Sequence, residues 1–141
     1  MDYEDVKAKL LWNWTHDEPI ASEIYTEDAL LEFPQSGEKF RGKENFITWR
    51  SEHPAQAIEF EFRSLRGEGD LWLAEGRVEV NGGALVPFVD ILHFRGNLVD
   101  RETIYQCDPF PPSEARAPFA ERTELDATPE LPMRIKAAGR E

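Results

Sequence analysis

Asp90 is the residue of this chain whose type and surroundings best suit chemistry. It stands in an apolar run between Phe88 and Leu92, on a strand face that Tyr105 is expected to share. A carboxyl group among such side chains is disfavoured in its charged form. It therefore either acts as a proton donor or needs a charged partner.

Strand pairing offers Arg101 as that partner. If residues 95 and 96 form a tight turn, Asp90 lies directly opposite Arg101 in the next strand. The same register turns His93 and Glu102 to the other face, which excludes both from a site around Asp90. Two interpretations stay open: a pocket acid, and a cross-strand ion pair with no chemical role.

Glu75 is a second candidate, and its orientation depends on turn length. With a four-residue loop over residues 67–70 and a two-residue turn at residues 81 and 82, Glu75 points inward near Asp90 and can act as base to that acid. Two facing carboxyls would then push one pKa upward. Three-residue turns instead place Trp72 inside and Glu75 outside. The sequence leaves both orientations open.

Six aromatic residues suit the wall of an apolar ligand-binding pocket, although packing in the core is the commoner fate of such side chains. They are Tyr25, Phe33, Trp49, Phe62, Phe88 and Tyr105. Such a pocket would accept a small apolar molecule, for example one bearing a carbonyl group.

Helical periodicity predicts three helices before the strands begin. They cover residues 5–14, a short segment from Pro19 to about residue 25, and residues 43–53, with a short strand over residues 29–33 before the third. Strands follow over residues 57–66, 71–80, 84–94 and 98–107, separated by Gly-rich turns. Such turns predict an antiparallel meander, with the short strand free to add at an edge. The fold class is therefore α+β, with three N-terminal helices packed on a curved antiparallel sheet.

The run over residues 84–94 is apolar on both faces, and Val89 and Ile91 lie on the face that points away from the side chain of Asp90. Helices can cover only one face of the sheet. We therefore expect a homodimer formed through the other face.

The charge of the chain narrows the class of partner. It contains 28 Asp and Glu against 16 Lys and Arg, which gives a formal net charge of −12 at pH 7. The resulting field repels phosphate backbones and anionic lipids, so neither nucleic acid nor a membrane is expected as partner. A lone Cys107 without metal-type Cys/His spacing predicts no disulfide, metal or cofactor. An acidic N-terminus with no long apolar run predicts a cytoplasmic protein.

Four segments resemble the nuclear-transport-factor-2-like superfamily, and within it the SnoaL-like branch. They are YTEDALLEFP at residues 25–34, FRGKE at 40–44, VDILHFRG at 89–96 and YQCDPF at 105–110. The resemblance spans about residues 5–110 and implies a cone-shaped fold. We expect this domain over residues 1–110, and a Pro-rich tail over residues 111–141 that wraps the surface or is partly disordered.

The resemblance also bears on chemistry. The ketosteroid isomerases of this superfamily carry an Asp-x-x-x-Phe pattern whose aspartic acid donates a hydrogen bond to the substrate oxyanion, and Asp90 to Phe94 match it. Their general-base aspartate corresponds to Phe33 here, and their first-helix tyrosine falls near Leu11 and Trp12. Steroid isomerisation by that mechanism is therefore not expected.

Three functions fit these observations. The first is an isomerase, cyclase or dehydratase that uses the carboxylic acid of Asp90 on a small apolar ligand. The second is a non-catalytic binding module with the same pocket, and the third is a dimeric accessory protein whose pocket is a filled core. The fold alone does not choose among them.

Overall fold

Two α-helices and a 3-10 segment open the structure, a computed structural model that describes residues 1–53, 58–122 and 133–136. They are α1 (Tyr3–Thr15), η1 (Ile20–Ile24) and α2 (Lys43–Glu52). The Asp2 side chain caps α1 by accepting the Asp5 N–H at 2.9 Å. All three segments lie where helices were predicted, but the second is 3-10 and not α-helical. No helix among the described residues is long and apolar enough to span a membrane.

Seven strands form one sheet in the order β2-β1-β6-β5-β4-β3-β7. Their bounds are β1 Tyr25–Phe33, β2 Glu38–Arg41, β3 Ile58–Glu68, β4 Leu71–Val80, β5 Leu85–Arg95, β6 Leu98–Gln106 and β7 Met133–Lys136. The antiparallel meander from β3 to β6 is confirmed. β1 pairs in parallel with β6, and β2, which was not predicted, pairs with β1 at the sheet's edge.

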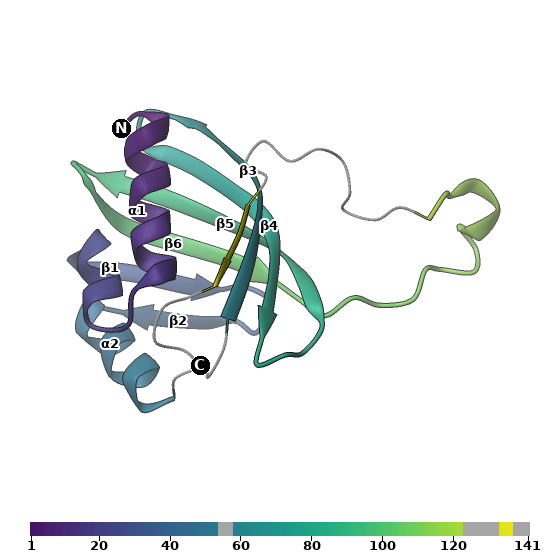
Figure 1. Cartoon of the computed structure of the whole chain (residues 1–141), viewed down its shortest axis with the longest axis horizontal. Helices are drawn as coiled ribbons and strands as arrows, with labels where there is room; N and C mark the ends of the chain where they lie inside the picture. The colour runs from purple at the N-terminus through teal and green to yellow at the C-terminus, as the bar shows by residue number, and fades with distance from the viewer. Residues whose placement is uncertain (54–57, 123–132, 137–141) are drawn as a thin grey trace.

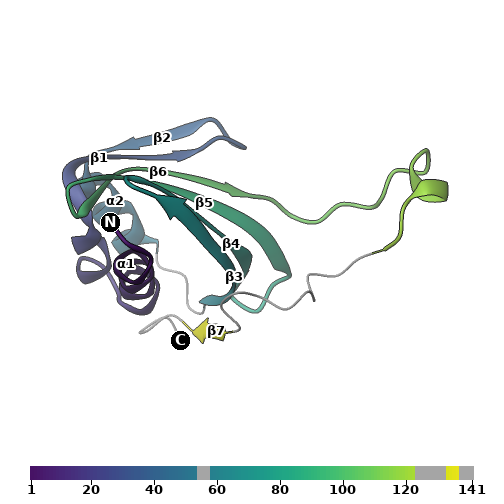
Figure 2. The same ribbon diagram turned by 90° about the horizontal axis from the view of Figure 1, so that it is seen from above.

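The sheet curves around the helices, which cover its concave face (Figures 1 and 2). Val6 and Leu10 of α1 and Phe46 of α2 are buried in one cluster with Leu92 and Phe94 of β5. Apolar burial of this kind stabilises by about 25 cal/mol per Å². The predicted α+β class with a curved sheet is thus confirmed.

The pairing of β5 with β6 contains a bulge that the sequence did not reveal. Arg95 pairs with Leu98 across a two-residue turn, in which Gly96 adopts a φ of +67°. The turn lies one residue later than expected, which moves the pairing by two positions and keeps the same side chains on each face. The register then shifts by one residue, which leaves Asp100 as the extra residue of β6. A one-residue shift reverses the faces beyond it.

This reversal changes the neighbours of Asp90. Asp90 pairs with Ile104 instead of Arg101, and Glu102 lies on the inner face. Tyr105 lies on the outer face and is 48% exposed. The predictions that Asp90 shares a face with Tyr105 and that Glu102 points away were therefore wrong.

A second bulge lies in β3, next to the pairing partner of Glu75. The turn between β3 and β4 has two residues, and one extra residue, Arg63, shifts the register of β3. Glu75 consequently pairs with Ser64 on the outer face, whereas Trp72 is buried on the inner face. The inward orientation of Glu75 was wrong, because Glu75 pairs with Val89 of β5 and so faces away from Asp90. The bulge in β3 lets Phe62 stay on the inner face although Glu75 lies on the outer one.

The C-terminal tail leaves the sheet at the end of β6. Residues 107–122 run away from the sheet (Figures 1 and 2) and include η2 (Ala117–Phe119). β7 pairs antiparallel with β3 at residues 59–62. The remainder of the tail lies outside the described residues, and the domain boundary at residue 110 stays a prediction.

The outer face of the meander carries an accessible apolar patch beside charged residues such as Glu75 and Arg77. Leu71 is 57% exposed and Leu73 is 38% exposed, and Val89 and Ile91 lie beside them on β5. Scattered apolar residues are normal on a protein surface, but a contiguous patch on a sheet indicates an interaction site.

We expect this face to hold two copies of the chain together. Light scattering at micromolar concentration should report about twice the 16.2 kDa of one chain. Val89→Asp and Ile91→Asp should yield monomers with an unchanged helical circular dichroism signal, because a charge would be buried in the contact. Phe110→Asp, in the exposed tail, is the matched control and should remain dimeric. A wild-type monomer at high concentration would disprove the expectation.

Candidate functional site

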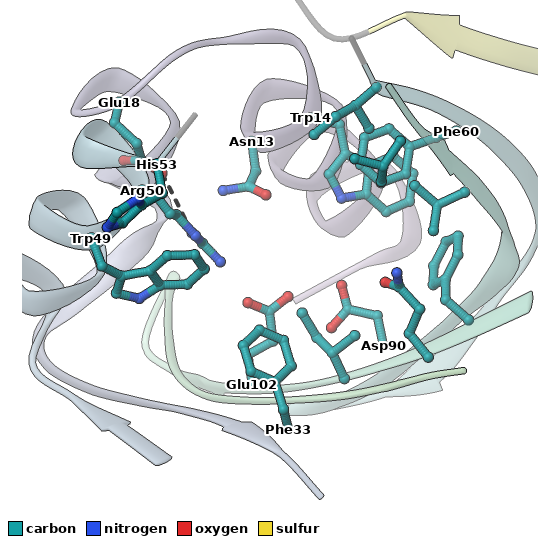
Figure 3. A pocket seen from close by; sticks show the side chains of 16 residues that line it. Asn13, Trp14, Glu18, Phe33, Trp49, Arg50, His53, Phe60, Asp90 and Glu102 are labelled. Carbon is teal, nitrogen blue, oxygen red and sulfur yellow. Dashed lines mark hydrogen bonds and ion pairs between the residues drawn. The ribbon is translucent and has the colours of Figure 1, made fainter. Parts of the chain in front are cut away.

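A cavity of about 240 Å³ lies between the concave face of the sheet and the C-terminal parts of α1 and α2 (Figure 3). Its apolar wall consists of Trp14, Phe33, Trp49, Ile58, Phe60, Val78, Val80, Phe88 and Ile104. Its polar residues are Asn13, Glu18, Arg50, His53, Asp90, Glu102 and Gln106. The volume is just below the roughly 300–1,000 Å³ common for ligand sites, so the cavity suits a small molecule.

β5 and β6 supply two carboxyl groups that line the cavity. Alternation along β5 places Phe88 and Asp90 on the inner face, and the bulge in β6 brings Glu102 to the same side. Ala74 of β4 lies opposite Asp90, and its small side chain leaves room for the carboxyl group.

Asp90 and Glu102 form a buried carboxyl pair, and each residue is only 3% exposed. They are diagonal neighbours on adjacent strands, and their carboxyl groups lie side by side in the cavity (Figure 3). Tyr25, buried at the start of β1, donates its hydroxyl to Glu102 Oε1. Asp90 Oδ1 is buried and accepts no hydrogen bond within the described part of the chain.

The environment of the pair favours the protonated form of Asp90. Burial raises the pKa of Asp90 well above its ordinary value. The negative charge of Glu102 and a hydrogen bond to it raise this pKa further, while Arg50 opposes the shift. Burial, with the charge of Glu102, also raises the pKa of Tyr25. The phenol therefore keeps its proton and remains a donor.

Arg50 of α2 is the buried cation of the site. Its Nη1 lies 3.4 Å from Glu18 Oε1, and the Glu18 side chain is only 4% exposed. The guanidinium carbon lies 5.4 Å from the centroid of the Trp49 ring. Burial disfavours its charge, but Tyr25, Glu102 and Glu18 outweigh that effect and raise the pKa of Arg50.

Four predicted site residues meet at the cavity, and four do not. Those that line it are Asp90, Phe33, Trp49 and Phe88. Tyr25 contacts it only through Glu102, Phe62 packs in the core against Trp14, and Tyr105 and Glu75 belong to the outer face.

Several polar residues of the cavity were not predicted from the sequence, among them Glu102, Arg50, Glu18 and Asn13. Glu102 was assigned to the wrong face, while Arg50 follows Trp49 in the predicted helix and offered no separate signal. The alternative partner of Asp90 was also wrong, because Arg101 is exposed and its Nε lies 3.1 Å from Glu32 Oε1. Over residues 1–53, 58–122 and 133–136 no group of three or more His, Cys, Asp or Glu side chains is arranged to hold a metal ion.

The family of the chain follows from comparison with known proteins. The sequence model of the SnoaL-like domain matches residues 11–102, so the chain belongs to the SnoaL-like family. An NTF-2 like protein of unknown function from Burkholderia xenovorans LB400 is similar at 34% identity, with a TM-score of 0.71 over 86% of this chain and 97% of that one. The resemblance to the nuclear-transport-factor-2-like superfamily is thereby confirmed.

Two further solved structures share the fold at lower identity. A protein assigned as a candidate ketosteroid isomerase from Kribbella flavida has 21% identity and a TM-score of 0.70, over 89% of this chain and 96% of that one. A candidate polyketide cyclase from Sinorhizobium meliloti has 19% identity and a TM-score of 0.58, over 72% of this chain and 93% of that one. No curated protein matches the chain.

The raised pKa of Asp90 predicts how stability depends on pH. The folded state keeps a proton that the unfolded state releases above about pH 3.9, so the free energy of unfolding falls as the pH rises from there towards the folded-state pKa. The slope is at most about 1.4 kcal/mol per pH unit for one proton. Asp90→Asn keeps the shape but cannot titrate.

Urea unfolding of both proteins at several pH values measures this dependence. The Asn variant should become progressively more stable relative to wild type as the pH rises above about 4. Parallel stability curves would show that the Asp90 carboxyl titrates alike in the folded and unfolded states.

Proposed function

We propose that the cavity binds a small, largely apolar molecule whose polar group contacts the carboxyl pair of Asp90 and Glu102. The observation that carries this proposal is the buried pair in the wall of an otherwise mostly apolar cavity, with Asp90 Oδ1 unpartnered. Unpaired buried acceptors destabilise a fold, so a site that keeps one commonly serves a ligand.

The same pair supports acid–base chemistry of the isomerase, cyclase or dehydratase type. A protonated Asp90 is a proton donor and an ionised Glu102 is a proton acceptor, and burial raises the pKa of Asp90. Strongly perturbed carboxyls in a cavity are typical of such chemistry. A binding protein without catalysis uses the same contacts, and turnover of a bound ligand distinguishes the two.

The proposal also covers macromolecular partners, cellular location and oligomeric state. The net charge of −12 opposes binding to nucleic acid and to anionic membranes. The lone Cys107 agrees with a reducing compartment, and we place the protein in the cytoplasm as a homodimer.

Calorimetric titration with naphthalene-sized compounds tests the proposal. 2-Ethylnaphthalene and 2-acetylnaphthalene represent an apolar and a carbonyl-bearing ligand, and at least one compound of this size should bind saturably. Ile104→Trp should weaken that binding at least about tenfold, or 1.4 kcal/mol, because the larger side chain fills the cavity opposite Asp90. Tyr105→Trp, one position along on the outer face, should bind like wild type. Equal binding by both variants would place the ligand elsewhere.

A further inference from the structure

The carboxyl pair is short of hydrogen-bond donors. Tyr25 donates to Glu102 Oε1, and the proton of Asp90 is engaged with Glu102. Asp90 Oδ1 receives no donor from the described residues. One N–H of the Asn13 amide donates to the Ala21 carbonyl at 2.9 Å, and the amide oxygen is directed into the cavity (Figure 3). The cavity therefore presents acceptors that lack partners.

The charges around the cavity are unequal as well. Arg50 is positive and is paired with Glu18, which leaves the negative charge of Glu102 only partly compensated. Asp90 is neutral as long as it holds its proton, and the exposed His53 lies at the end of α2. A negative site inside apolar walls attracts cations more strongly than the same charge would in water.

The aromatic side chains in the cavity wall are compatible with a positively charged ligand. Phe33, Phe60 and Phe88 come from three different strands and line the space beside the carboxyls. Aromatic rings have negative faces and attract ammonium groups, while their carbon surface accommodates apolar groups. A ligand that is both cationic and apolar thus matches both parts of the cavity.

We propose that the ligand is a small primary or secondary amine, bound as its ammonium ion with its N–H groups on Asp90 and Glu102. This inference rests on the proposed function and names its ligand class. Charge-assisted hydrogen bonds from an ammonium group would satisfy Asp90 Oδ1 and neutralise the excess charge of Glu102.

The competing arrangement is a carbonyl ligand held by donors. Arg50 has further N–H groups, and the buried Trp49 Nε1 has no acceptor within the described residues. To donate to a carbonyl, Asp90 would have to withdraw its proton from Glu102. At Asp90 that exchange loses one hydrogen bond for each one formed, whereas an ammonium ion adds bonds to the carboxyl pair without breaking any.

Two ligands of nearly identical shape decide between these arrangements. 1-(2-Naphthyl)ethylamine is an ammonium ion at pH 7, and 2-acetylnaphthalene carries a carbonyl on the same skeleton. Calorimetry on the full-length wild-type protein should give a dissociation constant at least about tenfold lower for the amine, or 1.4 kcal/mol. Glu102→Gln should bring the two constants within about threefold by removing the charge. Glu75→Gln removes a carboxyl from the outer face and should keep the preference.

The possible results distinguish failure of the amine assignment from failure of the proposed function. Tighter binding of 2-acetylnaphthalene, or equal binding, overturns the amine assignment and leaves a ligand-binding cavity. A preference for the amine that survives in Glu102→Gln overturns the role of the pair. If neither compound nor 2-ethylnaphthalene binds, the proposed function itself fails. The wild-type comparison alone can overturn the inference even if Glu102→Gln does not fold.

Discussion

One extra residue in each of two strands decides which side chains reach the cavity. Asp100 is the extra residue in β6, and Arg63 is the extra residue in β3. Because side chains alternate along a strand, each bulge reverses the faces beyond it. The bulge in β6 brings Glu102 inside, whereas Glu75 lies outside, next to the bulge in β3. Asp100 is held across the strands, with its Oδ1 2.6 Å from His93 Nδ1.

The bulge in β6 places a second carboxyl beside Asp90. The surrounding structure must offset the free-energy cost of burying it. Burial of an uncompensated carboxylate costs several kcal/mol. Tyr25 from β1 donates a hydrogen bond to Glu102, and Arg50 from α2 supplies positive charge. Tyr25 belongs to a strand of the sheet, whereas Arg50 belongs to a helix that covers its concave face. The pair therefore ties β1, α2, β5 and β6 into one electrostatic unit, and removal of any member would affect the others.

The helices and strands could be predicted from the sequence, whereas the residues of the site could be predicted only in part. Periodicity found both α-helices and all four meander strands, because burial of one face imposes a repeating pattern. Asp90, Phe33, Trp49 and Phe88 were also found, since their faces do not depend on the bulges. Glu102 and Glu75 were misplaced because a bulge adds one residue without a compositional signal. Arg101 and Glu102 are adjacent in sequence and therefore face opposite sides of the sheet. The register of β6 decides which of the two enters the cavity.

β7 covers β3 along residues 59–62, so this long strand presents no free backbone groups over that stretch. At the other end of the sheet lies β2, which has only four residues, three of them charged. Short, charged strands at an edge discourage the addition of strands from other molecules. Both edges are thereby shielded from strand addition, and the broad outer face remains the surface through which we expect copies of the chain to pair.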